Sequence, residues 1–354
     1  MSNLPRLIIN LKKLVHNFQT IRQHCQSAGI KLNVVVKGLA GDRQIVAHLR
    51  AAGMDELGDS RWENLLEFSK YPGLTKLLLR LPSLSTAATT VEFADASLNA
   101  ELATLKALDY YARGKARRHQ VFLMVDQGDL REGVMEADLP ALAAGCRNLN
   151  HLEVIGVGVN FSCFAGAQPT SAALTRLVEL AEELRSEFDL PVQYVSGGNS
   201  SSLPLLYDRS LPPGVNHLRI GEAILLGRET LHGTILPDLF SDAFCVEAEI
   251  LQVQWKPGKP YGPVGRDAFG RIPDFSELDA GVRLLINLGE QDSPAAGLRP
   301  LEPGVKVLGG NSDYLVLAGE GRFQVGQTIR FLPDYRSLLA LMSSRYVVKE
   351  YREF

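Results

Sequence analysis

The sequence contains little cysteine: four residues in 354, at Cys25, Cys146, Cys163 and Cys245. None of them belongs to a Cys-x-x-Cys pair, so the usual ligand spacing of a zinc site is missing and we expect no metal. Few, widely spaced cysteines are typical of free thiols in a reducing compartment. We therefore expect a cytoplasmic protein.

Long apolar runs and an excess of one charge sign are also missing. No stretch of 18 apolar residues occurs, which predicts no membrane span. The opening MSNLPRLIINLKKL lacks the long apolar segment and the small-residue cleavage site of a signal peptide. The net charge of −3 argues against a nucleic-acid binder, because such proteins normally carry a basic face.

Two phosphate-binding patterns are absent as well. No GxGxxG follows an early strand, and no GxxxxGK[ST] occurs. What the first two thirds of the chain does contain is an alternation of apolar strands and amphipathic helices, which predicts a parallel sheet. We expect an eight-stranded α/β (TIM) barrel, because the alternative, a doubly wound sheet, would carry the missing GxGxxG. The expected helices cover 11–21, 44–52, 100–111 and a long stretch after Thr170 or Ser171, and the expected strands include 33–37, 76–80, 121–125, 154–157, 192–195 and 217–220.

After about residue 235 the pattern changes from helical to strand-like. Short β-rich runs, punctuated by Gly and Pro, occur at 245–253, 282–288, 305–308 and 314–317. The length of the chain allows one barrel and a second, smaller domain. We expect an N-terminal strand at 1–11 that packs with the β domain, the barrel at 12–235, and the β domain at 236–354.

Lys37 is the first candidate for chemistry. It ends the apolar run NVVVK and is followed by Gly38. Barrel active sites lie at the C-terminal ends of the strands, where a partly desolvated lysine has a depressed pKa and acts as an amine nucleophile. The alternative is a structural lysine whose ammonium snorkels to solvent, which is the commoner case for an isolated lysine.

A second candidate is Arg131, in the segment VDQGDLREG that follows the strand at 121–125. Its guanidinium is a charged donor fork suited to a phenolate, carboxylate or phosphate. The alternative is a surface ion pair with Asp129 or Glu132.

Two further segments are suited to an anion. The segment SGGNSSS at 196–202 combines glycines and hydroxyl side chains and precedes an apolar stretch. Exposed backbone N–H groups at such a helix start bind anions. The alternative is an ordinary Ser-rich loop that caps the helix. NHLRIGE at 216–222 ends the last expected strand, and TIM barrels often bind phosphate near strands seven and eight.

Segments along nearly the whole chain, in collinear order, resemble one family. They are IINLKKLVHNFQTIRQHC, VVVKGLAG, GDSRWENL, VDQGDLREG, NFSCFAG, GGNSSSLPLL, NHLRIGEAILLG, DAFGR, INLGEQD and YRSLLALMSSRYVVKEY. They resemble the alanine racemase superfamily of fold-type III enzymes, which use pyridoxal 5′-phosphate (PLP), and are most similar to its ornithine/lysine racemase branch. The resemblance implies a racemase, an isomerase that interconverts L- and D-amino acids.

The resemblance also implies roles around the cofactor ring. Lys37 would hold the PLP aldehyde and act as one catalytic base. Arg131 would approach the phenolic oxygen, and Asn160 stands where alanine racemases place a histidine against the ring. Arg219 would face the pyridine nitrogen. Because arginine stays protonated, it disfavours a protonated ring nitrogen and favours racemisation over decarboxylation, since decarboxylases of this fold type use an acidic partner there.

The phosphate of PLP would be held by a second group of residues. Ser200 and the backbone N–H groups near Gly221 and Glu222 form the expected cradle, and Tyr335 would add a hydroxyl.

The second catalytic base is less clear from the resemblance. Alanine racemases supply a tyrosine from the partner subunit, in a Gly-Tyr-x-Asp segment, whereas residues 289–292 read GEQD here. Glu290 could replace the tyrosine, because burial raises a carboxyl pKa, or Cys163 could serve. The alternatives are a structural carboxylate for Glu290 and a small buried side chain for Cys163.

The resemblance implies a free amino acid as the substrate, and we expect a basic one such as ornithine or lysine. Asp267, Glu290 and Asp292 could pair with its distal ammonium, unless they are simply solvated. A homodimer is expected, in which the partner's β domain completes each active site. The remaining alternatives are an alanine, serine or broad-specificity racemase, a decarboxylase, a non-catalytic PLP carrier, and a barrel without PLP.

Overall fold

The computed structural model describes residues 4–276 and 278–353, and the chain divides into two compact units. One unit is Leu14–Phe240, and the other combines the chain before Leu14 with the chain from Ser241 onward. These divisions lie a few residues from the expected ones at 11/12 and 235/236. The outer ends of the expected segments, residues 1–3 and 354, and residue 277 lie outside the described part of the chain.

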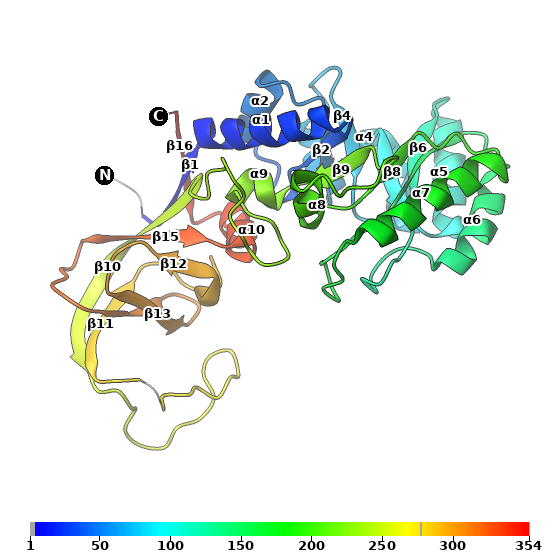
Figure 1. Cartoon of the computed structure of the whole chain (residues 1–354). Helices are drawn as coiled ribbons and strands as arrows, with labels where there is room; N and C mark the ends of the chain where they lie inside the picture. The colour runs from blue at the N-terminus through cyan, green and yellow to red at the C-terminus, as the bar shows by residue number, and fades with distance from the viewer. Residues whose placement is uncertain (1–3, 277, 354) are drawn as a thin grey trace. The chain divides into compact units, whose positions relative to one another are not determined.

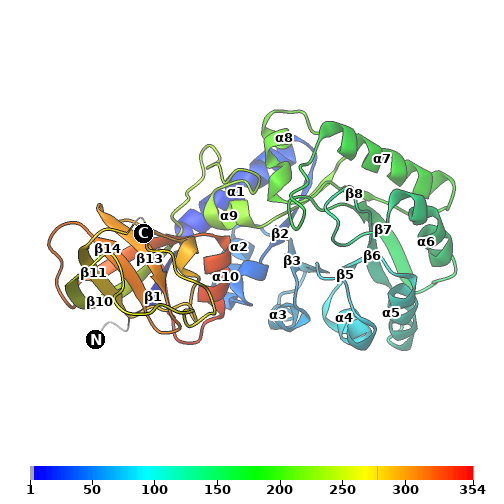
Figure 2. The same ribbon diagram turned by 90° about the horizontal axis from the view of Figure 1, so that it is seen from below.

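The larger unit is a closed barrel of eight parallel strands, as predicted. The last strand pairs with the first, with Arg219 opposite Asn33 in the register. Figure 2 shows the ring of strands with α3 to α7 on its outside. In chain order the strands are β2 (Lys31–Val35), β3 (Glu56–Asp59), β4 (Thr75–Leu78), β5 (Ala96–Asn99), β6 (His119–Met124), β7 (Leu152–Gly158), β8 (Tyr194–Ser196) and β9 (His217–Ile220).

The helices of the barrel form where apolar residues recur at helical spacing. In α7 (Ser171–Ser186) the buried residues are Leu174, Leu177, Leu180, Ala181 and Leu184, and the Thr170 side chain caps the helix by accepting from the backbone N–H of Ala173 at 3.1 Å. The other helices are α1 (Leu11–Ser27), α2 (Arg43–Ala51), α3 (Trp62–Glu67), α4 (Ala87–Phe93), α5 (Leu102–Gly114), α6 (Leu139–Cys146), α8 (Leu203–Tyr207) and α9 (Glu222–Leu226), with short 3₁₀ helices η1 (Lys37–Leu39), η2 (Leu84–Thr86), η3 (Glu136–Asp138) and η4 (Ser200–Ser202).

The buried side chains of the strands are of two kinds. A small apolar cluster joins β4 to β7 and contains Leu77, Ala96, Leu98, Phe122, Met124 and Ile155. The neighbouring strands β8, β9, β2 and β3 instead bury polar side chains, among them Asn33, Glu56, Ser196, His217 and Arg219. Burying a polar group costs free energy unless the group is hydrogen-bonded. The polar side chains on this side of the barrel therefore need hydrogen-bond partners, which are described below.

The smaller unit is an eight-stranded, mainly antiparallel sheet (Figure 1). Its central order is β12-β15-β10-β11-β14-β13. The N-terminal strand β1 pairs with β10 on one side and, in parallel, with the C-terminal strand β16 on the other. The strands are β1 (Arg6–Asn10), β10 (Phe244–Lys256), β11 (Gly281–Ile286), β12 (Leu298–Pro300), β13 (Val305–Gly310), β14 (Leu315–Gly319), β15 (Thr328–Pro333) and β16 (Val348–Arg352).

The smaller unit also contains helical segments that the sequence pattern did not reveal. Helix α10 (Tyr335–Ser343) buries Leu338, Leu341 and Met342 and is capped by the Asp334 side chain, and a 3₁₀ turn, η5 (Ala295–Gly297), precedes β12. The predicted β domain therefore also contains a helix and a 3₁₀ turn.

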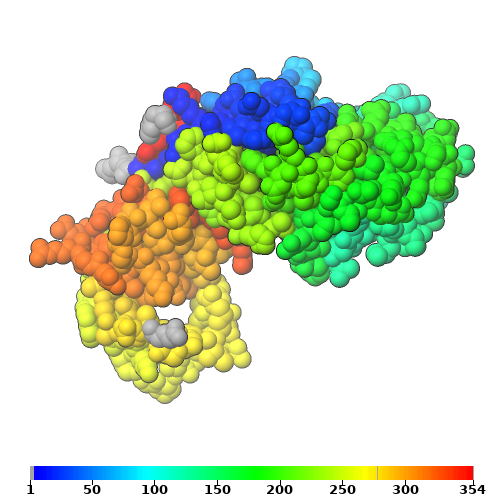
Figure 3. Space-filling model, in the orientation of Figure 1, coloured from blue at the N-terminus to red at the C-terminus, as the bar shows by residue number. Residues whose placement is uncertain are grey.

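A long connection joins β10 to β11 in the smaller unit. Its described residues contain neither helix nor strand, and it stands off from the sheet of its own unit (yellow in Figure 3). It exposes apolar side chains such as Tyr261 and Ile272. No helix in the described part of the chain combines the length and apolar character needed to cross a membrane.

Candidate active site

Lys37 lies just beyond the C-terminal end of β2, as the first residue of η1. The prediction that it ends the strand was wrong by two residues, because β2 stops at Val35. The side chain is half-buried. Burial lowers the pKa of the Lys37 ammonium, and the nearby Arg131 cation lowers it further, although Cys163 and Asp59 act in the opposite direction. The amine is therefore more easily deprotonated than an ordinary lysine.

Asp59 ends the neighbouring strand β3 and is completely buried. Its carboxylate accepts hydrogen bonds from the backbone N–H of Arg61 at 2.9 Å and from the Asn64 amide at 3.1 Å. Burial raises the pKa of Asp59 to about 6, while these bonds and Lys37 limit the rise. The sequence analysis did not select Asp59. A charged residue at the end of a barrel strand was the signal that could have identified it.

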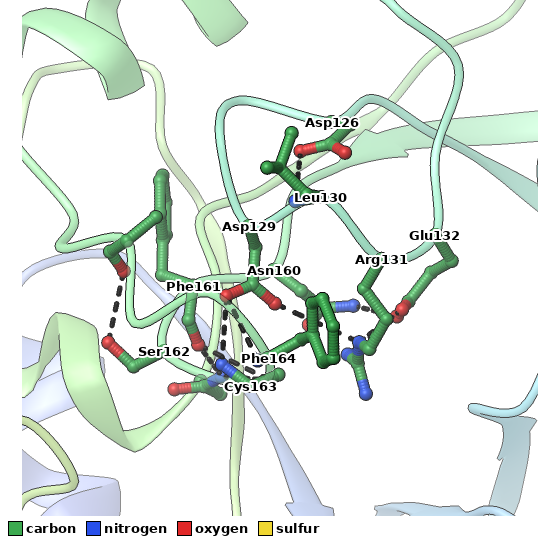
Figure 4. A network of polar contacts seen from close by, with 12 residues as sticks. Asp126, Asp129, Leu130, Arg131, Glu132, Asn160, Phe161, Ser162, Cys163 and Phe164 are labelled. Atoms are coloured by element: carbon green, nitrogen blue, oxygen red, sulfur yellow. Dashed lines mark hydrogen bonds and ion pairs between the residues drawn. The ribbon is translucent and has the colours of Figure 1, made fainter.

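Arg131 lies in the loop after β6, and Glu132 connects it to Asn160 in the loop after β7 (Figure 4). Glu132 accepts from Arg131 Nη2 at 2.7 Å and from Asn160 Nδ2 at 2.5 Å. The ion-pair alternative for Arg131 is thus observed, yet its side chain remains 39% exposed and can still reach a ligand. Glu132, which the sequence analysis treated only as a surface partner, orients two of the expected cofactor residues.

Arg219 is buried at the C-terminal end of β9. It donates to Ser196 Oγ, to the Val159 carbonyl at 2.7 Å and to Asn160 Oδ1 at 2.8 Å. Burial lowers the pKa of Arg219 to about 10, so the guanidinium is still a cation at neutral pH. Arg219 and Asn160, two residues expected at the cofactor ring, are therefore in direct contact.

Cys163 is held in the loop after β7 by a buried carboxylate (Figure 4). Asp129 accepts from the backbone N–H groups of Cys163 at 3.0 Å and Phe164 at 3.2 Å. The thiol donates to the Phe161 carbonyl at 3.3 Å and accepts from Asn199 at 3.4 Å. Cys163 is exposed, so the alternative of a small buried side chain is wrong. Desolvation by the surrounding atoms still raises the pKa of its thiol, although Arg131 lowers it. The Cys163 thiol and the Lys37 amine each influence the other's pKa.

The residues expected to hold a phosphate meet where β8 and β9 end. Ser200 Oγ accepts from the backbone N–H of Ala223, in the first turn of α9, and Gly221 and Glu222 open the same helix. A Cβ at Gly221 would lie 3.0 Å from the backbone oxygen of Val35, so this close approach favours glycine. The structure thus brings Ser200, Gly221 and Glu222 together. Gly221 also lies beside Val35, the last residue of β2, which precedes Lys37 by two positions.

In the smaller unit, Arg271 lies between two of the candidate carboxylates. It pairs with Asp267 at 2.7 Å and with Glu290 at 3.3 Å. Arg271 was not a candidate, because its spacing to Glu290 carries no sequence signal. The carboxylates of Asp267 and Glu290 are therefore already partnered by a cation.

Asp292 and Tyr335 have different surroundings in the same unit. Asp292 is buried and accepts from Ser344 Oγ at 2.6 Å, the arrangement of a structural carboxylate. Tyr335 is the first residue of α10 and is partly buried. Within residues 4–276 and 278–353, no group of three or more His, Cys, Asp or Glu side chains is arranged to hold a metal ion.

Comparisons with known proteins identify the family. Residues 9–229 match the family model described as the alanine racemase N-terminal domain. The ornithine racemase of Acetoanaerobium sticklandii is 37% identical over 350 residues, which cover 98% of this chain and 99% of the relative. The lysine racemase of Thermotoga maritima is 37% identical over 351 residues, covering 98% of each.

The fold likewise matches solved structures. The alanine racemase of Bartonella henselae, solved with covalently bound pyridoxal phosphate, superposes with a TM-score of 0.76 at 17% identity, over 99% of this chain and 100% of that one. That likeness shows the shared fold, and the full-length curated relatives show the family. The chain belongs to the alanine racemase family of fold-type III enzymes, and it is an amino-acid racemase.

Proposed function

We propose that this racemase binds PLP on Lys37 and interconverts the enantiomers of a basic amino acid such as ornithine or lysine. The observation that carries the proposal is the half-buried Lys37 amine, whose pKa is lowered at the C-terminal end of a barrel strand. Family members bind PLP, as the bound cofactor in the Bartonella henselae enzyme illustrates.

The residues present in the barrel fit PLP. Its aldehyde requires an amine that deprotonates readily, which Lys37 provides. Its phosphate requires N–H and hydroxyl donors, and Ser200 with the start of α9 provides both. Ser201 Oγ, buried next to Ser200, has no hydrogen-bond partner among the described residues, as a donor reserved for a ligand would.

When bound, PLP acidifies the α-proton of an amino acid by delocalising the negative charge. In the proposal, Lys37 Nζ removes or returns that proton on one face. Arg219 would face the ring nitrogen and, as a buried cation, would disfavour a proton there. Arg131 would hold the phenolic oxygen. Arg219 in place of an acidic residue supports racemisation rather than decarboxylation.

Replacing Lys37 with alanine tests the cofactor assignment. We expect purified protein supplied with PLP to absorb in the visible, and Lys37→Ala to lose both this band and activity, by about 10³-fold. Lys76→Ala, on strand β4, is the matched control and should retain both. A Lys37→Ala protein that keeps the visible band would refute the assignment.

The second base has two candidates in this proposal. Glu290 stands where alanine racemases carry a tyrosine, and the Cys163 thiol influences the pKa of Lys37. Exchange of the α-hydrogen with solvent deuterium, measured from each enantiomer, separates them. We expect Glu290→Gln to slow exchange from one enantiomer more than from the other. If Glu290→Gln leaves the exchange rates from both enantiomers unchanged, and Cys163→Ala slows exchange from one enantiomer only, the thiol is the second base.

Support for a basic substrate comes from the ornithine and lysine racemases that are 37% identical along their full length. The candidate carboxylates of Asp267 and Glu290 give weaker support for a basic substrate, because Arg271 already pairs with both. Incubating single enantiomers of ornithine, lysine, arginine, alanine and serine, and measuring the loss of optical rotation, tests the choice. We expect ornithine or lysine to react fastest, and a clear preference for alanine would exclude the basic class.

We also propose that the enzyme acts as a homodimer, each active site completed by the β domain of the partner. Sedimentation at micromolar concentration tests the assembly. Mixing Lys37→Ala with Glu290→Gln subunits tests the sharing of sites, because activity above either parent requires residues from two chains.

A further inference from the structure

Three buried side chains form a chain of hydrogen bonds that ends on Arg219. Glu56 Oε1 lies 3.1 Å from His217 Nε2, and His217 Nδ1 lies 2.6 Å from Ser196 Oγ. Ser196 Oγ in turn accepts from Arg219 Nη1. Glu56, His217 and Ser196, here called the polar relay, come from strands β3, β9 and β8, and each is at most 5% exposed.

The charge states of the side chains decide which group donates in each hydrogen bond of the polar relay. The hydrogen bond from His217 and the Lys31 ammonium at 2.7 Å hold the pKa of Glu56 at about 2 despite its burial, so Glu56 is an anion and accepts only. His217 must therefore carry a proton on Nε2. Burial lowers the pKa of His217, so the ring is neutral and its Nδ1 is an acceptor. The Ser196 hydroxyl consequently donates to His217.

That direction leaves Ser196 Oγ free to accept from Arg219. The hydroxyl is polarised by an acceptor chain that ends in the charge of Glu56, which strengthens it as an acceptor. With the Val159 and Asn160 bonds, three of the five guanidinium N–H groups have acceptors in the described part of the chain.

Burying Glu56 and Arg219 in one barrel costs free energy that an apolar interior would not. Strands β4 to β7 place an apolar cluster in the barrel instead. What distinguishes the polar relay is that its hydrogen bonds end on Arg219.

We propose that Ser196, His217 and Glu56 are positioning residues that hold Arg219 in one orientation for the reaction. None of them touches the substrate, and they act only through the guanidinium. The proposal rests on the proposed function for what Arg219 faces, whereas the proton positions in the polar relay stand without any cofactor.

The first experiment uses the cofactor-free protein with ¹⁵N-labelled histidine. We expect the ¹⁵N shifts of His217, assigned by their loss in His217→Phe, to show a neutral ring with the proton on Nε2. In Glu56→Gln this preference should weaken. A proton on Nδ1, or a charged ring at neutral pH, would reverse the Ser196 bond and overturn the polar relay whether or not the protein binds PLP.

The second experiment tests the effect on Arg219 in the loaded enzyme. Ser196→Ala, His217→Phe and Glu56→Gln should each shift the visible absorption maximum in the same direction and lower kcat about 10-fold, with KM changed less than threefold, since the guanidinium is misplaced rather than lost. The double variant Ser196→Ala/His217→Phe should be no worse than either single one, as expected of residues that act as a unit.

A second buried Ser–His pair in the same barrel provides matched controls. Ser97 Oγ and His119 Nε2 lie 2.8 Å apart, and both residues are completely buried. We expect Ser97→Ala and His119→Phe to lower the unfolding free energy about as much as the relay variants do. Neither control should shift the visible absorption maximum or change kcat. Equal spectral changes in these controls, or unchanged spectra in all three relay variants, would show that the polar relay is only structural.

Discussion

Burial, more than any single partner, sets the titration of the groups around Lys37. Burial is the largest influence on the pKa of the Lys37 amine and of the Asp59 carboxyl, and it moves both toward the neutral form. Their mutual attraction opposes this shift, because a pair of opposite charges favours both charged forms. An amine and a carboxyl that both titrate closer to neutral pH are suited to proton transfer.

The Asp59 shift predicts a pH dependence of stability. A carboxyl whose pKa is raised in the folded state contributes stability below its ordinary pKa of about 3.9 and loses it as the pH rises through about 6. The unfolding free energy of the cofactor-free protein, minus that of Asp59→Asn, should fall by about 2–3 kcal/mol between pH 4 and pH 7.5. Urea titrations at several pH values measure it, and a constant difference would contradict the raised pKa.

At the scale of elements, the strands that the sequence pattern missed are the short polar ones. The segments Glu56–Asp59 and Ala96–Asn99 are only four residues long, and neither is an apolar run, so they resemble loops in sequence. In the barrel all eight residues are buried. The pattern identifies strands that contain an apolar run, and it fails where a short strand has polar residues or glycine between its apolar ones.

Helix α7 offers a test of a local sequence signal. Thr170→Ala removes the acceptor for the backbone N–H of Ala173 and should lower the unfolding free energy by about 1 kcal/mol. Thr175→Ala is the control on the same helix. Its hydroxyl donates to the Ser171 carbonyl at an exposed position, so its loss should cost less than about 0.5 kcal/mol. Equal losses would show that the cap contributes nothing specific.

For the molecule as a whole, the two ends of the chain belong to one sheet. Strand β1 lies between β10 and β16, so the smaller unit needs both the first and the last segments of the sequence. Arg6 joins the three strands, because its guanidinium pairs with Glu247 at 2.6 Å and with Glu350 at 2.7 Å. These ion pairs are only partly exposed.

Arg6→Ala should therefore destabilise the smaller unit by about 1–2 kcal/mol, since it breaks charge-assisted bonds to two strands. Denaturation followed by the fluorescence of Trp255, in a Trp62→Phe background, reports on that unit. Arg330→Ala is the comparison, because its pair with Glu302 is more exposed and should contribute less than about 1 kcal/mol. A smaller loss for Arg6 than for Arg330 would contradict this account of β1.

The sequence by itself determined the barrel, the strand-rich second unit and the family, because hydrophobic periodicity and collinear motifs are local properties that survive without coordinates. It also identified Lys37, Arg131, Asn160, Ser200 and Arg219 as candidates, and their roles remain proposals. Only the tertiary structure decided what surrounds them: Asp59 beside Lys37, Glu132 between Arg131 and Asn160, and Arg271 against Glu290.

The polar relay shows the physical reason for that division. Glu56 and His217 are separated by 161 positions, and nothing near either residue in the sequence indicates the other. Closure of the barrel brings their strands together in a water-free interior, where a charge must find a partner or shift its pKa. Local patterns therefore predict elements, whereas the pairing of buried charges, and with it the setting of Lys37 and Arg219, appears only once the barrel closes.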